Sequence, residues 1–286
     1  MHLASLTQGW VSGIPKIGYD EIGQGPPLIF LHGIGGNRTN WINQQLAMAD
    51  ICTTISWDAR GYGRSEDYDG PLEFSDFSND LIRLLNSRKI DKAHFVGLSM
   101  GARILMDFFS IARDRVATLT LCDCFYSFKA ALTPEKQAEF IALRQKPLKQ
   151  GKSLEDIAPD LINSLVGPNC NEDVKIKLHQ SVSDLHIESY LKTIAASMSF
   201  DVSNRLIDFD VPVQLVYGEY DKLTPPSIGK DMMQQMPHAE MKVIEDAGHL
   251  SNMEQPDSFN NILRLFLNEY LTLASFEKEP IDLKHL

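Results

Sequence analysis

The chain lacks any apolar run approaching the ~20 residues that a membrane-spanning helix needs. Its start, Met1 to Gly13, has no cationic segment followed by a long apolar core, so we expect no export signal and a cytoplasmic protein. Positive charge is also scarce, because 27 Lys and Arg face 38 Asp and Glu, for a formal net charge of −11. Such a chain repels nucleic-acid phosphates and anionic lipid heads, so we expect neither nucleic acid nor a membrane as a partner.

Cysteine is scarce as well, and no pair has the Cys-x-x-Cys spacing that is typical of metal sites. In a chain of 286 residues, which is long enough to bury a sizeable core, we expect reduced, packed thiols and no structural metal. Internal repeats are absent from the sequence too. The length favours one domain with an inserted subdomain. The four cysteines are Cys52, Cys122, Cys124 and Cys170.

Short apolar runs alternate with helical patterns at both ends of the sequence, which is typical of a parallel sheet covered by helices on both faces. Apolar stripes at helical spacing run from Phe74 to Leu85 and from Phe259 to Tyr270. The sequence therefore predicts an α/β fold with a mostly parallel central sheet. We expect strands buried on both faces at residues 27–31, 53–57, 93–96, 116–122, 213–217 and 241–244.

The middle of the chain differs from its ends, because the strand signal disappears between about residues 124 and 204. The sheet pattern resumes afterwards, so this stretch is predicted to be an all-helical cap inserted over the active edge of the sheet. We expect a core of residues 1–123 and 201–274, a cap of residues 124–200 and a loosely held tail at 275–286. The cap helices are expected near 134–146, 153–166, 171–182 and 184–200.

The pentapeptide Gly97-Leu98-Ser99-Met100-Gly101 directly follows the strand expected at 93–96. A serine on a sharp strand-to-helix turn is held in strained backbone geometry, which small residues two positions before and after it permit. An apolar continuation without glycine or proline follows, as suits a buried helix. The pattern and its context predict that Ser99 is a nucleophile.

A serine hydroxyl is a poor nucleophile near neutral pH and needs a base that is itself oriented by an acid. His249 and Asp221 each follow a predicted strand, so both should reach the sheet edge that carries Ser99. The chain order Ser99, Asp221, His249 is the order expected of this architecture. Asp123, after the strand at 116–122, is the alternative acid, and we expect Asp221 to matter more.

An acyl-enzyme mechanism also requires N–H donors aimed at the oxyanion of the tetrahedral intermediate. The residue after the nucleophile, Met100, supplies one backbone N–H. The glycine-containing loop after the strand at 27–31 should supply the other, with Ile34 as the expected donor and Gly35 in reserve. His32 in the same loop is expected to bond the loop backbone rather than to act as a base.

Motifs at residues 32–33, 58–65, 97–101, 218–221 and 248–249 resemble, in family order, those of the α/β-hydrolase superfamily. Residues 224–226 and 247–256 resemble 3-oxoadipate enol-lactonases and related carboxylesterases. The resemblance implies the α/β-hydrolase fold and a small-molecule ester or lactone substrate. It also implies hydrolysis by Ser99, Asp221 and His249 without a cofactor. The oligomeric state stays open.

Two other functions stay open because substrate choice resides in the cap. The same three residues can cleave a carbon–carbon bond in ring-fission dienoates, and a small-molecule receptor can keep them with little turnover. The charge pattern bears on the substrate, since a strongly acidic protein repels an anionic lactone at long range. Residues 129–152 carry six basic side chains against two acidic ones, which is either a face that guides anions or a solvated helix face.

Overall fold

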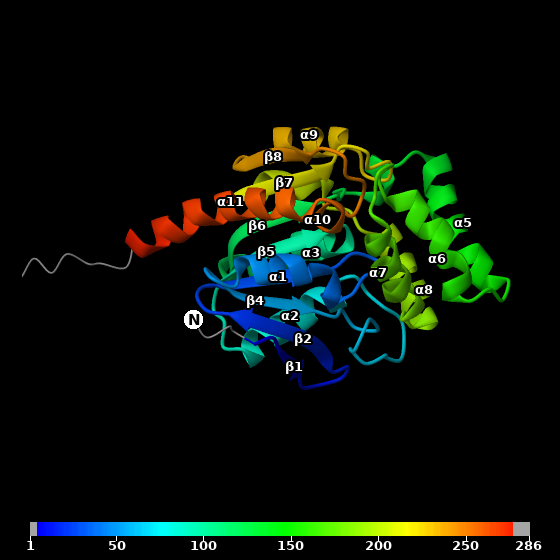
Figure 1. Ribbon diagram of the computed structural model, residues 1–286, viewed down its shortest axis with the longest axis horizontal. Coiled ribbons are helices and arrows are strands. Elements are labelled where there is room, and N and C mark those ends of the chain that lie inside the picture. Colours follow the sequence, from blue (N-terminus) through cyan, green and yellow to red (C-terminus); the bar gives the residue numbers. More distant parts are fainter. Residues whose placement is uncertain (1–4, 277–286) are drawn as a thin grey trace, which may run out of the picture.

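A computed structural model describes residues 5–276 and has an eight-stranded central sheet (Figure 1). Its strand order is β1-β2-β4-β3-β5-β6-β7-β8, in which β1 and β2 pair antiparallel and all pairs from β4 to β8 are parallel. The predicted α/β fold with a mostly parallel sheet is confirmed. The strands are β1 (Thr7–Val11), β2 (Ile17–Gly23), β3 (Pro27–Leu31), β4 (Thr53–Trp57), β5 (Ala93–Leu98), β6 (Val116–Cys122), β7 (Val213–Gly218) and β8 (Ala239–Ile244).

Strand prediction was wrong at the two edges of the sheet. β1 and β2 were not expected, because β2 carries Asp20 and Glu21 in place of an apolar run. Asp20 is nevertheless buried, paired with Arg38 and Arg64. The strand expected at 241–244 to be buried on both faces is the edge strand β8, in which Val243 is 43% exposed. An apolar run does not distinguish an edge strand from a central one.

The helices of the core follow the predicted apolar stripes, since Phe77, Leu81 and Leu84 are fully buried on α2. The last helix runs to Phe276, so it includes the first two residues of the tail expected at 275–286, and the rest of that segment lies outside the described residues. The core helices are α1 (Ile42–Met48), α2 (Ser75–Ser87), α3 (Met100–Ala112), α9 (Pro226–Gln235), α10 (Ser251–Glu254) and α11 (Pro256–Phe276), with 3₁₀ turns at Arg38–Trp41, Arg113–Arg115 and Ser203–Asp208.

Between β6 and β7 the chain forms helices only, and Figure 1 shows α5 to α8 gathered at one end of the sheet. Side chains of Thr133, Ser153 and Asn171 accept N–H groups of the first turns of α5, α6 and α7 and so define their starts. The last helix of this segment, α8, begins at Ile187 and not at the predicted residue 184, because Asp184 is the C-cap of α7. These helices are α4 (Phe128–Ala131), α5 (Pro134–Lys149), α6 (Leu154–Leu165), α7 (Glu172–Ser183) and α8 (Ile187–Met198).

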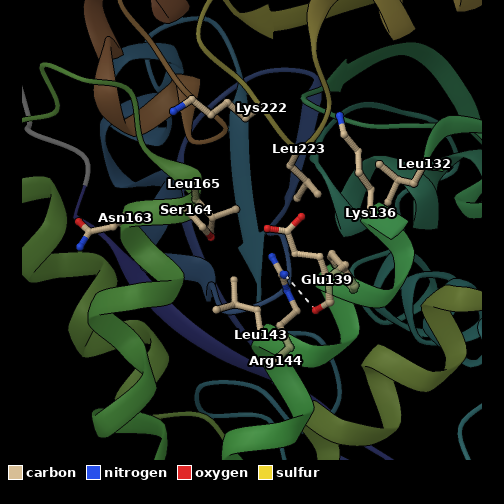
Figure 2. A pocket seen from close by; sticks show the side chains of 11 residues that line it. Leu132, Lys136, Glu139, Leu143, Arg144, Asn163, Ser164, Leu165, Lys222 and Leu223 are labelled. Atoms are coloured by element: carbon tan, nitrogen blue, oxygen red, sulfur yellow. Dashed lines mark hydrogen bonds between the residues drawn. The ribbon is translucent and has the colours of Figure 1, made fainter. Parts of the chain in front are cut away.

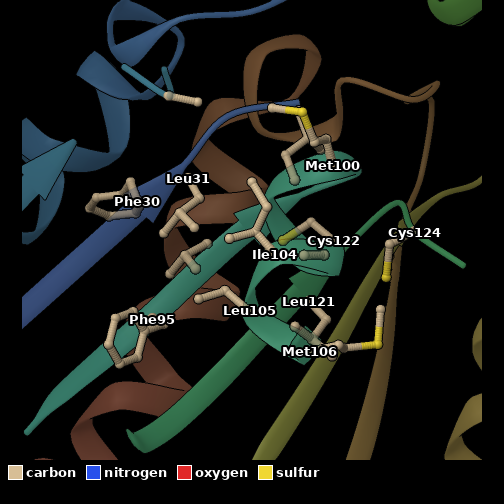
Figure 3. Packing of buried hydrophobic residues seen from close by; sticks show 14 of the residues in the cluster. Phe30, Leu31, Phe95, Met100, Ile104, Leu105, Met106, Leu121, Cys122 and Cys124 are labelled. Carbon is tan, nitrogen blue, oxygen red and sulfur yellow. The ribbon is translucent and has the colours of Figure 1, made fainter. Parts of the chain in front are cut away.

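The hydrophobic core lies where β3, β5 and β6 pack against α3 (Figure 3). Phe95, Ile104 and Leu121 are fully buried there. Fully burying one such side chain contributes roughly 1.5–3 kcal/mol, so the end of β5 and the start of α3 are held firmly in place. Cys124 is a buried free thiol whose pKa burial raises to about 12, which makes it unreactive.

Candidate active site

Ser99 stands at the sharp turn between β5 and α3, with φ 52° and ψ −106°. A Cβ on Gly97 would meet the backbone of Gly101 and Ala102, and a Cβ on Gly101 would meet the Leu31 carbonyl, so both positions require glycine. Backbone strain of this kind costs about 1–3 kcal/mol and persists where the surroundings hold it. The side chain of Ser99 is half-buried, whereas its chain neighbours are buried. The turn therefore presents the serine, as its sequence context predicts.

Asp221 and His249 form a hydrogen-bonded pair, with 2.8 Å between His249 Nδ1 and Asp221 Oδ2. The loops after β7 and β8 carry them, and both residues are buried. Asp221 Oδ1 accepts the N–H groups of Leu223 and Thr224, both at 2.9 Å, and the Thr224 hydroxyl donates to Oδ2 at 2.5 Å. Because an ionised carboxylate only accepts, His249 Nδ1 carries the proton and Nε2 keeps its lone pair.

Ser99 lies on the same sheet edge as this pair, since β5, β6, β7 and β8 are consecutive parallel strands and the three residues follow carboxyl ends. Among the hydrogen bonds of residues 5–276, none joins the Ser99 hydroxyl to His249. Without substrate, bonds between a nucleophile and its base are commonly long and shorten only in the complex. The geometry thus places Asp221 in contact with His249 and places Ser99 on the same edge of the sheet.

Asp123, the alternative acid, has both carboxyl oxygens engaged elsewhere. Oδ1 accepts the Gly218 N–H at 2.8 Å and Oδ2 accepts the Ser251 hydroxyl at 2.5 Å. Burial, followed by the nearby charge of Asp221, raises the pKa of Asp123 well above its ordinary value. Asp123 therefore joins the end of β7 to the start of α10, and Asp221 is the carboxylate on His249.

Glu254 holds the loop that carries His249. One carboxylate oxygen accepts the N–H groups of Gly248 and Leu250, both at 3.1 Å, and the other accepts the N–H of Gly167 at 2.7 Å. The His249 N–H donates to the Leu165 carbonyl at the end of α6, over 2.8 Å. The histidine loop is thus bonded both to α10 and to the helical segment between β6 and β7.

Three residues with these supporting contacts had no predicted role, namely Thr224, Ser251 and Glu254. All three lie in segments whose resemblance to other hydrolases was noted. A hydroxyl three residues after a loop aspartate is a usable signal for Thr224, because such side chains commonly bond within a turn. Glu254 bonds two nearby N–H groups, of Gly248 and Leu250, and one distant N–H group, of Gly167, which no local sequence pattern indicates.

The two expected oxyanion donors belong to two segments that adjoin Ser99. Met100 begins α3, so its N–H has no acceptor within the helix. Ile34 lies in the turn after β3, where Gly36 N donates to the Gly33 carbonyl at 3.1 Å. A Cβ on Gly33 would lie 3.3 Å from the Ser99 Cβ, so this turn passes directly beside the serine.

His32 bonds the loop backbone, as its position predicts. Its Nδ1 donates to the Gly33 carbonyl over 2.8 Å, and its Nε2 accepts the N–H of Ala59 at 3.0 Å. Burial lowers the pKa of His32, which favours the neutral ring that these two bonds require. Both nitrogens are occupied, so the ring ties the turn beside Ser99 to the loop after β4.

Within residues 5–276, no three His, Cys, Asp or Glu side chains are grouped as metal ligands would be. None of the described helices combines the length and apolarity that a membrane crossing needs. The described cysteines are free thiols, buried at Cys52, Cys122 and Cys124 and half-buried at Cys170.

Comparison with known proteins places these features in a family. The family profile described as the alpha/beta hydrolase family matches residues 28–262. A 3-oxoadipate enol-lactonase of Acinetobacter baylyi is 27% identical over 89% of this chain and 94% of its own. A 2-hydroxy-6-oxononadienedioate/2-hydroxy-6-oxononatrienedioate hydrolase of Burkholderia vietnamiensis is 25% identical over 93% of this chain and 98% of its own. The chain belongs to the alpha/beta hydrolase family.

A solved structure agrees with this assignment. A thermophilic esterase from Thermogutta terrifontis, with malate bound, superposes with a TM-score of 0.81 at 26% identity. The match covers 93% of this chain and 99% of the esterase. The resemblance to enol-lactonases expected from the sequence is confirmed, and a general hydrolase function is supported.

Proposed function

We propose that this protein is a serine hydrolase that cleaves carboxylic ester or lactone bonds of small molecules through an acyl-enzyme. The observation that carries the proposal is the 2.8 Å bond between His249 and Asp221 on the sheet edge where the strained turn presents Ser99. The enol-lactonase and esterase relatives support this choice of bond. Residues 124–200 act as the cap over that edge, and residues 1–123 with 201–274 form the core.

In the first half-reaction the Ser99 hydroxyl attacks the carbonyl carbon while His249 Nε2 takes its proton. Asp221 stabilises the resulting imidazolium through Nδ1. The backbone N–H groups of Met100 and Ile34 bond the oxyanion, and removal of such a donor typically costs about 10²–10³ in kcat. His249 then gives the proton to the leaving oxygen, which departs and leaves the acyl group on Ser99.

In the second half-reaction a water molecule takes the place of the leaving alcohol. His249 accepts its proton, the hydroxide attacks the acyl-enzyme carbonyl, and the same two N–H groups bond the new oxyanion. Collapse of this intermediate returns the proton to Ser99 and releases the acid. In a lactone the leaving oxygen and the acyl group belong to one molecule, so a single hydroxy acid is released.

The experiment that tests this proposal compares Ser99→Ala with the wild type on p-nitrophenyl acetate. We expect kcat/KM to fall by at least about 10³-fold with an unchanged melting temperature, because the nucleophile alone is lost. Ser110→Ala, on the exposed side of the same helix α3, is the matched control and should keep full activity. Turnover by Ser99→Ala at the wild-type rate would refute the proposal.

A panel that pairs lactones with ring-fission dienoates tests the bond that is cleaved. The Burkholderia relative is named for a dienoate hydrolase reaction, which makes carbon–carbon cleavage the alternative to include. Ester and lactone turnover without dienoate turnover supports the proposal. One acyl group per chain followed by almost no release would instead indicate a receptor with the same three residues.

A further inference from the structure

A cavity of about 330 Å³ lies between α5, α6 and the loop that follows Asp221 (Figure 2). It adjoins the acid–histidine pair, because Lys222 and Leu223 come directly after Asp221 and both line it. Leu165 lines it as well, and its carbonyl accepts the His249 N–H. The loop after Asp221 therefore forms one wall of this cavity, and the helices between β6 and β7 form the other.

The charged residues that line the cavity are Lys136, Glu139, Arg144 and Lys222, three cations and one carboxylate. Arg144 is the buried member, at 5% exposure, whereas Lys136 and Glu139 are exposed. Figure 2 shows the Arg144 side chain directed into the cavity. A positive cavity is unexpected in a protein with a net charge of −11, and it indicates an anionic occupant.

Arg144 has little to compensate its burial. Among the described residues its guanidinium makes one hydrogen bond, to the Phe140 carbonyl of its own helix at 3.3 Å, and it lies 3.8 Å from the Phe140 ring centre. In the described part of the chain, no carboxylate lies within ion-pair distance of Arg144, Glu139 included. A buried charge without a counter-charge is costly, so such a group is commonly kept for a ligand.

Arg103 is a second buried cation in the same condition. It lies one turn after Ser99 on α3 and is 2% exposed. Within the described residues its guanidinium makes one hydrogen bond, to the Ser197 carbonyl at 3.4 Å, and it lies 4.8 Å from the centre of the Phe125 ring. Within residues 5–276 it too has no carboxylate partner. Burial, with a smaller effect of the Arg144 charge, lowers the pKa of Arg103 to about 10, so it stays protonated at neutral pH. One buried guanidinium group thus lines the cavity, on Arg144, and a second lies on α3 one turn after Ser99, on Arg103.

We propose that this cavity binds a carboxylate that the substrate carries in addition to the bond that is cleaved, and that Arg144 determines this specificity. The inference rests on the proposed function and names its substrate class: monoanionic esters or lactones with a short aliphatic chain. The guanidinium fork matches a carboxylate bidentately. Lys136 and Lys222 add positive charge at the cavity, and Leu143 and Leu223 give the aliphatic chain an apolar wall.

The test compares two esters that differ only at the far end, monomethyl adipate with a carboxylate and methyl hexanoate with a methyl group. The wild type should prefer monomethyl adipate in kcat/KM by at least about tenfold, as a charge-assisted hydrogen bond allows. Arg144→Met should abolish this preference and leave methyl hexanoate within about twofold, and Arg144→Lys should restore part of it. Lys149→Met, an exposed charge on the same helix outside the cavity, is the matched control and should keep the preference.

A binding measurement separates this inference from the proposed function. Titration of adipate into the wild type, Arg144→Met and Lys149→Met by calorimetry requires no turnover. Loss of adipate binding only in Arg144→Met supports the anion site, whether or not either ester is hydrolysed. Absence of hydrolysis of both esters would refute the esterase proposal and leave the anion site standing. Equal adipate binding in all three proteins, or an equal fall in kcat/KM for both esters in Arg144→Met, would overturn the anion site and make Arg144 a packing residue.

Discussion

At the scale of single residues, Asp221 and Asp123 are both buried carboxyl groups, and their hydrogen-bond partners determine which of them can orient His249. Asp221 receives two backbone N–H groups, the Thr224 hydroxyl and the His249 ring N–H. Asp123 receives one N–H and one hydroxyl and has no contact with the ring. Only Asp221 can therefore orient His249, although both residues follow carboxyl ends of neighbouring strands.

Substituting each aspartate by asparagine should separate the two roles. Asp221→Asn should lower kcat on p-nitrophenyl acetate by about 10³–10⁴-fold, because an amide in place of the carboxylate favours the wrong tautomer of His249. Asp123→Asn should change kcat by less than about tenfold, since an amide oxygen can still accept the Gly218 N–H. Steady-state kinetics of both variants check this, and a larger loss at Asp123 would reverse the assignment.

The pH dependence of stability should reveal the burial of Asp123. Its pKa is raised by burial and by the Asp221 charge, so its contribution to stability is present below the ordinary value near 4 and is lost as the pH rises through the folded-state pKa. Relative to the wild type, Asp123→Asn should therefore gain stability as the pH rises from 4.5 to 8, by at most about 1.4 kcal/mol per pH unit. Urea unfolding across this range measures the difference, and a constant difference would contradict the shift.

The positions of the candidate site residues could be predicted where they depend on local sequence and strand order. Ser99 is marked by glycines on both sides, and Asp221 and His249 are marked by their places after strands. The role of Glu254 in joining two segments could not be predicted, because its partner Gly167 is 87 residues away in the chain and comes close only on folding. The sequence showed Arg144 only as one of the six basic residues between 129 and 152. Its burial could not be predicted, because it depends on packing between helices.

At the scale of elements, the backbone of the loop between β8 and α10 packs closely against the helical segment between β6 and β7. A Cβ on Gly248 would meet the backbone of Leu165 to Gly167, which cannot give way as a side chain does. A Cβ on Gly218 would meet the carbonyls of Ala247 and Gly248 in the same loop. Close backbone contact therefore sets the position of His249 as much as its own bond to Asp221 does.

Gly248→Ala should disturb this contact. We expect a loss of about 1–3 kcal/mol in the free energy of unfolding, as for other overpacked positions, together with a fall in kcat, because the histidine loop must shift. Gly151→Ala is the control: it lies between α5 and α6 with nothing within 4 Å, and its φ of 89° makes alanine strained there too. The control should lose stability but keep kcat, and equal kcat in both variants would argue against coupling of this contact to the histidine.

Elements with strong apolar patterns were predictable, and polar or edge elements were not. The five central strands and helices α5 to α8 lie within a few residues of their expected places, whereas the short helix α4 was not expected. β2 escaped prediction because the charge of Asp20 is neutralised by Arg38 and Arg64, which are distant in sequence. Tertiary pairing of this kind overrides the local preference against acidic residues in strands.

At the scale of the whole molecule, charge is distributed unevenly between the core and the helices at its active edge. The chain is acidic overall, yet residues 129–152 are basic and place Lys136 and Arg144 in the cavity that Lys222 and Leu223 also line. The net negative charge repels polyanions at long range, and the anion site that we propose is the exception. The fold class follows from the alternation of strands and helices, whereas the position of the cavity depends on helix packing over the sheet.

We propose above all that Ser99 is the nucleophile that attacks the substrate and that His249 is the base that activates it. The most direct measurement is peptide mapping by mass spectrometry after reaction with a fluorophosphonate, with His249→Ala treated in parallel. We expect one adduct per chain on the peptide that contains Ser99, and at least about 10³-fold slower labelling in His249→Ala. An adduct on another residue, or equal labelling rates in the two proteins, would contradict it.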